Sequence, residues 1–306
     1  MRALVTGATG FIGGQLARRL HDDGFEVRCL VRDRGSEAAE ALAAARCELA
    51  VADLTATAGL AEALEGVEVA YFLVHMIDGG EDYPAIERAA AARFGRAASA
   101  AGVKRTVYLG GLGDESASRH LGARHQAAIA LGEQGPPLTY FRAAMVIGPG
   151  SESYELLRGI VERLPALAAP DWLRTETQPI GADDVIDYLR EAIDVPRAAG
   201  REIQIGGPRV LTHLELVEEM AAALGRTPPR QLPMPAEVAR PATVAAGAAA
   251  VTPGTPEIAS QISLGLTTPT VVTDPSAAEL FSVRPKPLDA VLAASVDAVS
   301  AESAAP

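Results

Sequence analysis

Residues 1–14 read MRALVTGATGFIGG, which indicates a short apolar strand at 3–5, a glycine turn, and a helix that begins at Phe11. Gly7 permits the tight turn, Gly10 lets the backbone approach a pyrophosphate, and Gly13 lets the helix pack closely on the strand. A second strand follows at 26–31, so the βαβ context is complete. The pattern predicts dinucleotide binding, with the phosphates on the helix N-terminus. The predicted contacts in this segment are Thr6, Gly7, Thr9, Gly10, Phe11, Ile12 and Gly13.

The residues after the second strand indicate which dinucleotide is bound. An acidic side chain at this place accepts hydrogen bonds from the ribose hydroxyls of NAD. This chain instead has Arg32 and Arg34 on either side of Asp33. A guanidinium suits a 2′-phosphate, so we expect NADP(H) in preference to NAD(H). Two alternatives stay open: the arginines are only solvated loop charges, or Asp33 serves the ribose.

Composition limits the class of protein and its partners. The chain has 306 residues, of which 48% are hydrophobic, and it lacks the run of about eighteen apolar residues that spans a bilayer. The first strand leaves no room for a signal peptide, so we expect a cytoplasmic protein. A net charge of −12 disfavours nucleic acid as a partner. The expected partner is a small-molecule substrate, bound by a monomer or homodimer.

The two cysteines show no spacing typical of a metal site. Cys29 lies in the second strand and Cys47 near the third. A reducing compartment argues against a disulfide between them. We therefore expect two small buried apolar side chains and no bound metal.

Strand and helix patterns alternate along the chain, as a doubly wound parallel sheet requires. Further strands are predicted at 47–51, 67–74, 105–109 and 138–141. The stretch 67–74 is almost continuously apolar, which is typical of a strand buried on both faces. We therefore predict an α/β protein with a Rossmann sheet. Residues 1–150 form the dinucleotide-binding core and 176–206 return to the sheet, while 151–175 and 207–306 form a smaller substrate lobe.

Residues at the carboxyl ends of these strands are the other candidate cofactor contacts. They are Asp53, Leu54, Val74, His75, Gly110, Ala144 and Met145. Asp53 has a second interpretation, as the cap of a helix at 55–64. His75 is either a catalytic group or a packing contact of the nicotinamide ribose. The substrate pocket is predicted to be lined by Gly111, Met145 and Trp172, with the lobe core as the alternative place for Trp172.

Later segments carry helix-start and loop signals. Asp183 and Asp184 are read as the first residues of a helix rather than as catalysts. Thr212 and Glu215 have the spacing of a capping box. Residues 227–257 are rich in Pro and Ala and include an apolar run at 242–251, which predicts a lid or a helix packed over the pocket.

The order of these motifs resembles the short-chain dehydrogenase/reductase superfamily, in its atypical NmrA-like branch. The resemblance rests on four segments: TGATGFIGG at 6–14, VKRTVYLGGLGD at 103–114, RAAMVIGPG at 142–150 and QPIGADDVIDYL at 178–189. It implies a Rossmann-type sheet with a smaller C-terminal lobe over the nicotinamide end of the cofactor, where a substrate would bind.

The chain departs from the pattern of this superfamily at the catalytic positions. Typical members carry a hydroxyl residue at the end of the fifth strand and a Tyr-x-x-x-Lys pair on the next helix. Here the strand ends in LGG at 109–111, and His120 and Arg124 occupy the positions of the pair. Their spacing of four places them on one helix face. One hypothesis makes His120 the proton donor, although the charge on Arg124 would lower the pKa of the imidazole.

Other sources of the proton remain open at this stage. His120 has a structural alternative, as a solvent-facing or packed side chain. A substrate with its own phenol or enol, or an ordered water, would also serve, because the cofactor itself carries the hydride.

Two function classes follow from these observations. The first is an NADPH-dependent ketoreductase, which reduces a ketone or enone of a hydrophobic, polycyclic aromatic small molecule in secondary metabolism. The second is a non-catalytic NADP-binding redox sensor or assembly factor of the NmrA-like type. An enzyme is expected to have an apolar cavity beside the nicotinamide, whereas a sensor is expected to have that space filled or to expose a partner surface. An isomerase or dehydratase is disfavoured because it needs the missing acid/base pair.

Overall fold

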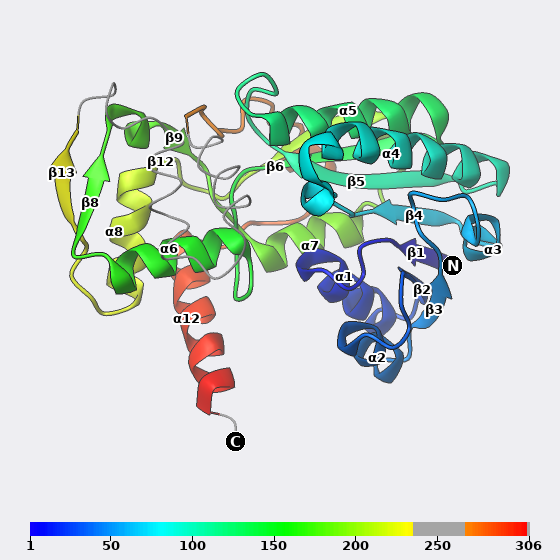
Figure 1. Cartoon of the computed structure of the whole chain (residues 1–306), viewed down its shortest axis with the longest axis horizontal. Helices are drawn as coiled ribbons and strands as arrows, with labels where there is room; N and C mark the ends of the chain where they lie inside the picture. The colour runs from blue at the N-terminus through cyan, green and yellow to red at the C-terminus, as the bar shows by residue number, and fades with distance from the viewer. Residues whose placement is uncertain (235–266, 305–306) are drawn as a thin grey trace.

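A seven-stranded sheet forms the centre of the computed structural model, which describes residues 1–234 and 267–304 (Figure 1). Its strand order is β11-β6-β5-β4-β1-β2-β3, and all neighbouring strands are parallel. The strands are β1 (Arg2–Val5), β2 (Glu26–Val31), β3 (Glu48–Val51), β4 (Val69–Phe72), β5 (Arg105–Gly111), β6 (Leu138–Ala143) and β11 (Arg201–Ile205). From β1 the chain adds β2 and β3 on one side, and it then crosses to the other side of β1 to add β4, β5, β6 and β11. This change in the order of the strands confirms the predicted doubly wound Rossmann fold.

Two layers of helices cover the sheet. Residues of α1 (Phe11–Asp22), α2 (Glu37–Ala44) and α7 (Ala182–Glu191) share one buried cluster with Ala3 and Val5 of β1. The opposite cluster joins Leu4 to residues of α3 (Leu60–Leu64), α4 (Tyr83–Ala100) and α5 (Arg119–Gln134). Successive residues of a strand point to opposite faces, so β1 contributes to both layers.

A smaller lobe lies beside the carboxyl ends of the strands (Figure 1). Its helices α6 (Glu152–Arg163), α8 (His213–Ala223) and α12 (Leu288–Ala304) pack around a third buried cluster that includes Tyr154, Leu216 and Leu292. Three short strand pairs complete it: β7 (Val146–Ile147) with β10 (Ile180–Gly181), β8 (Ala166–Ala169) with β13 (Arg230–Pro233), and β9 (Glu176–Thr177) with β12 (Leu211–Thr212). The remaining short elements are α11 (Ser276–Leu280) and the 3-10 turns η1 (Ile77–Asp82), η2 (Asp171–Arg174) and η3 (Pro196–Ala198).

The helix predicted at 55–64 is shorter in the structure, where α3 spans only Leu60–Leu64. The carboxylate of Asp53 accepts hydrogen bonds from Thr55 N at 2.8 Å and from Thr55 Oγ1 at 2.7 Å. This local turn competes with helix formation. The interpretation of Asp53 as a helix cap is therefore wrong, because Gly59 occupies the N-cap position.

Two helix starts agree with the sequence patterns. Asp183 and Asp184 lie in the first turn of α7. The capping box at α8 is present in both directions: the Thr212 hydroxyl accepts from the backbone N–H of Glu215, and the Glu215 carboxylate accepts from that of Thr212. Of the segment 227–257, residues 235–257 and with them the apolar run at 242–251 lie outside the described residues.

Both cysteines are buried free thiols, as predicted. Within the described ranges, no helix has both the length and the apolar character needed to cross a membrane. The same residues contain no group of His, Cys, Asp and Glu side chains arranged to hold a metal ion.

Candidate active site

One cavity of about 950 Å³ follows the carboxyl ends of the parallel strands and reaches the lobe. Ligands bind at this edge in open α/β sheets. Most of the sequence-predicted site residues line this cavity. They are Gly7, Thr9, Gly10, Phe11, Ile12, Gly13, Arg32, Asp53, Leu54, Val74, His75, Gly110, Gly111, His120, Arg124, Ala144 and Met145.

The glycine turn between β1 and α1 forms one end of the cavity. Gly7 has a φ of +64°, and a Cβ at this position would lie 2.5 Å from the carbonyl oxygen of Leu73. A Cβ on Gly13 would lie 2.2 Å from the carbonyl oxygen of Gly7. Only glycine fits at either place. Gly10 caps α1 without a side-chain hydrogen bond, and the first turn of α1 holds no acidic residue, so this helix end suits a diphosphate.

Thr6 supports this turn instead of lining the cavity. Its side chain is fully buried, and its Oγ1 accepts a hydrogen bond from Leu73 N at 3.1 Å. This bond ties the end of β1 to the chain that leaves β4. The prediction that Thr6 contacts the cofactor is therefore corrected to a supporting role.

The two arginines after β2 separate in the structure. Arg32 is exposed and lines the cavity beside Asp53, whose pKa is lowered by the Thr55 hydrogen bonds and further by the charges of Arg32 and Arg93. Arg34 does not line the cavity; its Nη2 donates to the carbonyl oxygen of Leu49 at 2.7 Å. The prediction of Arg34 as a cofactor contact is corrected on this ground. Asp33 does not line the cavity either.

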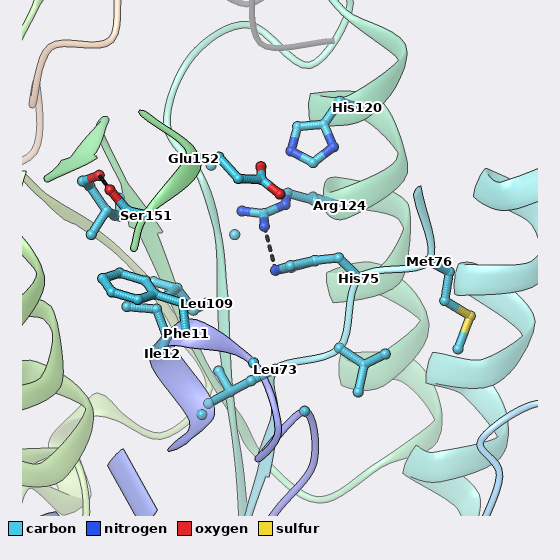
Figure 2. A pocket seen from close by; sticks show the side chains of 18 of the residues that line it. Phe11, Ile12, Leu73, His75, Met76, Leu109, His120, Arg124, Ser151 and Glu152 are labelled. Carbon is cyan, nitrogen blue, oxygen red and sulfur yellow. Dashed lines mark hydrogen bonds between the residues drawn. The ribbon is translucent and has the colours of Figure 1, made fainter. Parts of the chain in front are cut away.

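The other end of the cavity, here called the acceptor end, brings together His75, His120 and Arg124 (Figure 2). His75 follows β4, whereas His120 and Arg124 lie one turn apart on α5. Arg124 Nη2 donates a hydrogen bond to His75 Nε2, and the two imidazole rings meet edge to face with centroids 6.4 Å apart. The sequence therefore identified three side chains that do converge in space.

The surroundings of both imidazoles at the acceptor end disfavour their protonated forms. Desolvation and then the charge on Arg124 lower the pKa of His75 to about 4. The same two causes, with a smaller contribution from His75, lower the pKa of His120 to about 2. Neither ring carries the extra proton that a general acid would donate, which argues against His120 as the proton donor.

Several lining residues come from the lobe and were missed in the sequence. They are Gly150, Ser151, Glu152, Ser153, His213 and Thr270. They come from three separate parts of the chain, at 150–153, 213 and 270, and only the tertiary structure brings these parts together. Trp172 packs against the lobe cluster and does not line the cavity. The prediction of Trp172 as a pocket wall is corrected, and its alternative place in the lobe core is the observed one.

Arg142 fixes the loop between β5 and α5, which borders the cavity. Its Nε donates to the carbonyl oxygen of Gly111 at 3.1 Å, and its Nη2 donates to that of Gly113. Its Nη1 lies 2.9 Å from carboxylate oxygens of both Glu115 and Glu202. This bridging role gave no signal in the sequence.

The chain matches the model of the NmrA-like family over residues 1–240. This protein belongs to the NmrA-like family. The resemblance stated from the sequence motifs is thereby confirmed. No curated protein sequence matches it significantly.

Solved structures share the fold of this NmrA-like protein at low sequence identity. Triphenylmethane reductase of Citrobacter sp., complexed with NADP(H), has a TM-score of 0.74 and 20% identity, with 96% of this chain and 100% of that chain covered. An NADPH-dependent quinone oxidoreductase from Escherichia coli, complexed with NADPH, has a TM-score of 0.70 and 20% identity, with 98% and 100% covered. A nucleoside-diphosphate-sugar epimerase from Pseudomonas aeruginosa has a TM-score of 0.74 and 22% identity, with 99% and 98% covered.

Proposed function

We propose that this NmrA-like protein is an NADPH-dependent reductase that acts on a ketone or enone of a hydrophobic small molecule. The observation that carries the proposal is a single cavity that joins the glycine turn to the acceptor end. A non-catalytic sensor would be expected to have the acceptor end filled by side chains. The cavity volume of about 950 Å³ lies within the range typical of ligand and cofactor sites.

The residues of the cavity fit a nicotinamide dinucleotide. The diphosphate would lie against Gly10 and the first turn of α1, and the adenosine ribose near Arg32 and Asp53. The exposed Arg32 guanidinium supports a preference for a ribose that carries a 2′-phosphate. Two reductases of similar fold are complexes with NADP(H) or NADPH, which supports the same cofactor here. When bound, the reduced cofactor supplies a hydride to the acceptor.

The acceptor end combines apolar and charged side chains. Leu121 and Met145 offer apolar surface, and Arg124 offers a cation. This mixture suits a flat aromatic acceptor that carries one oxygen. The names of the two similar reductases, for triphenylmethane and for quinone, also denote conjugated acceptors.

Cofactor binding and turnover can be tested separately. Calorimetric titration of the full chain with NADPH should show binding, and the absorbance of NADPH should then fall on addition of an aromatic ketone or enone. No heat at millimolar NADPH on folded protein would refute the proposal. Binding without turnover across a broad acceptor panel would favour the second candidate function.

The second candidate is an NADP-binding redox sensor. It is favoured by one observation: β5 ends in Leu109, Gly110 and Gly111, without the hydroxyl group of a standard proton relay. A sensor should respond to the redox state of the dinucleotide. Its affinities for NADPH and NADP⁺ would differ, whereas no acceptor would be reduced.

A further inference from the structure

Arg124 stands at the acceptor end, where its guanidinium lies beside the ring of His75 (Figure 2). Its Nη2 donates to the neutral imidazole of His75, and its Nε is buried without a hydrogen-bond partner in residues 1–234 and 267–304. At this hydrogen bond the guanidinium meets an imidazole and not a carboxylate, so the contact itself adds no opposite charge. Arg124 is therefore a preorganised cation that faces the cavity.

Glu87 lies behind His75 and is almost completely buried, with a relative exposure of 1%. Its Oε2 accepts a hydrogen bond from Met76 N at 3.2 Å, and its Oε1 lies 3.9 Å from His75 Nδ1. Burial alone would raise the pKa of Glu87, but the neighbouring His75, the charge on Arg124 and the hydrogen bond from Met76 N lower it overall. Glu87 is thus an ionised carboxylate on the far side of the imidazole from the arginine.

This order of groups favours one tautomer of His75. A carboxylate that faces Nδ1 favours the proton on that nitrogen, which leaves Nε2 as an acceptor. Nε2 then receives the N–H of Arg124. Other polar groups around the pair are the phenols of Tyr83 on α4 and Tyr108 on β5, the ring of His120 on α5 and the carboxylate of Glu152 on α6.

We propose that Glu87 acts through His75 to hold Arg124 as the oxyanion-binding group of this site, and that the acceptor is a conjugated carbonyl compound such as an enone. The inference rests on the proposed function and narrows its substrate class. Glu87 and His75 are positioning residues in this scheme, and Arg124 is the catalytic residue.

The chemistry explains the preference for a conjugated acceptor. A bound reduced nicotinamide would supply a hydride, which would form a C–H bond at the β-carbon of the acceptor. The C=C π pair would then shift to form an enolate, and Arg124 would hold the negative charge on its oxygen. Water protonates the enolate afterwards and leaves hydroxide. An isolated ketone would instead become a strongly basic alkoxide, which needs a proton donor in the same step. The neutral rings of His75 and His120 do not supply one.

A binding experiment tests anion recognition without turnover. A nitrophenol, whose neutral and ionised forms absorb differently, is titrated with pH in the presence of NADP⁺-loaded protein. The phenolate should bind at least about tenfold more tightly than the phenol, since a hydrogen bond to a charged group contributes about 1.5–3 kcal/mol. Arg124→Ala should abolish the preference and Glu87→Gln should reduce it. Glu133→Gln is the control, since it removes a charge from the exposed surface of α5. This variant should keep the preference for the phenolate.

Equal binding of both nitrophenol forms by the wild-type protein would overturn the inference. NADPH affinity is measured for each variant as a check on folding. If Arg124→Ala does not fold, Arg124→Gln replaces it, because glutamine keeps a polar side chain and carries no charge. A wild-type preference that survives intact in the arginine variant would also contradict the assignment.

A double-mutant cycle then tests whether Glu87 acts through the arginine. With an enone as acceptor, Arg124→Ala should lower kcat about 10²–10³-fold, as loss of an oxyanion donor does. Glu87→Gln alone should lower kcat about tenfold. The double variant should have the same kcat as Arg124→Ala alone. Multiplicative losses would show an independent structural role and overturn the inference. Equal turnover of an enone and its saturated ketone would do the same, whereas absence of turnover with every acceptor refutes the proposed function instead.

Discussion

At the scale of single residues, Arg32 is the side chain that we propose as the one that distinguishes the two nicotinamide dinucleotides. It is exposed and lines the cavity beside Asp53. We expect Arg32→Ala to weaken NADPH binding at least about tenfold more than NADH binding, because only NADPH offers a phosphate to a charge-assisted hydrogen bond. Calorimetric titration with both dinucleotides measures the two losses.

Arg34→Ala is the matched control for this change. Arg34 lies two residues away, but its guanidinium binds the Leu49 carbonyl and stays outside the cavity. The ratio of NADPH to NADH affinity should therefore remain that of the wild type. Equal losses of both dinucleotides in Arg32→Ala would remove the assignment of a 2′-phosphate site.

His120 provides a second prediction at this scale. Because desolvation and Arg124 lower its pKa to about 2, its ring is neutral at every working pH. We expect His120→Gln to change kcat by less than about tenfold, whereas loss of a general acid costs about 10²–10⁴-fold. Steady-state rates between pH 6 and 9 check this. A hundredfold loss with a new pH dependence would restore His120 as the proton donor.

The sequence predicted the residues that follow a recognisable motif and missed those that act through tertiary contact. The glycines of the turn between β1 and α1, and the pair His120 and Arg124, stand in a known order along the chain. Glu87 sits in an alanine-rich helix with no motif around it, and its role appears only because α4 packs beside the end of β4. Arg34 and Trp172 are residue types that suit the predicted contacts, but their side chains lie outside the cavity. No local sequence pattern encodes the direction in which a side chain points.

At the scale of elements, the packing of α1 on β1 depends on glycine at position 13. An added Cβ would lie 2.2 Å from the Gly7 carbonyl oxygen, a backbone atom that cannot move without opening the turn. We expect Gly13→Ala to lower the free energy of unfolding by about 1–3 kcal/mol, as overpacking does, and to weaken NADPH binding. Urea unfolding and calorimetric titration measure the two effects.

Gly132→Ala in α5 is the matched control. Its Cβ would meet Leu138 Cδ2 at 3.8 Å, which is ordinary contact, and the residue is exposed. Alanine is the better helix former, so this variant should gain roughly 0.5–1 kcal/mol and keep its NADPH affinity. A Gly13→Ala protein as stable as the wild type would mean that the turn is more adaptable than its geometry indicates.

Hydrophobic periodicity was sufficient for the long elements and insufficient for the short ones. The strands β1 to β6 of the sheet were predicted near their observed bounds. The two-residue strands β7, β9, β10 and β12 show no period, and they form because the lobe brings their partners together. At 55–64 the periodic pattern was right only for the last turn, since the Asp53 carboxylate holds Thr55 in a local turn.

At the scale of the whole molecule, the cavity exists because the lobe covers the carboxyl ends of the sheet, and His213 is buried where the two meet. Its relative exposure is 5%, it lines the cavity, and its Nε2 has no hydrogen-bond partner among the described residues. Desolvation lowers its pKa from 6.5 to about 4. The folded protein therefore binds this proton less readily than the unfolded chain.

A depressed folded-state pKa makes stability depend on pH in one direction. The contribution of neutral His213 is fully present above about pH 6.5 and is lost progressively as the pH falls toward about 4. Between pH 7.5 and 5 this one group should remove about 2 kcal/mol from the free energy of unfolding. Urea unfolding at the two pH values should show that His213→Gln loses about that much less than the wild type, and that His21→Gln on α1 loses as much as the wild type. An unchanged loss in His213→Gln would mean that the acid sensitivity arises elsewhere, and that the junction of lobe and sheet does not keep this ring neutral.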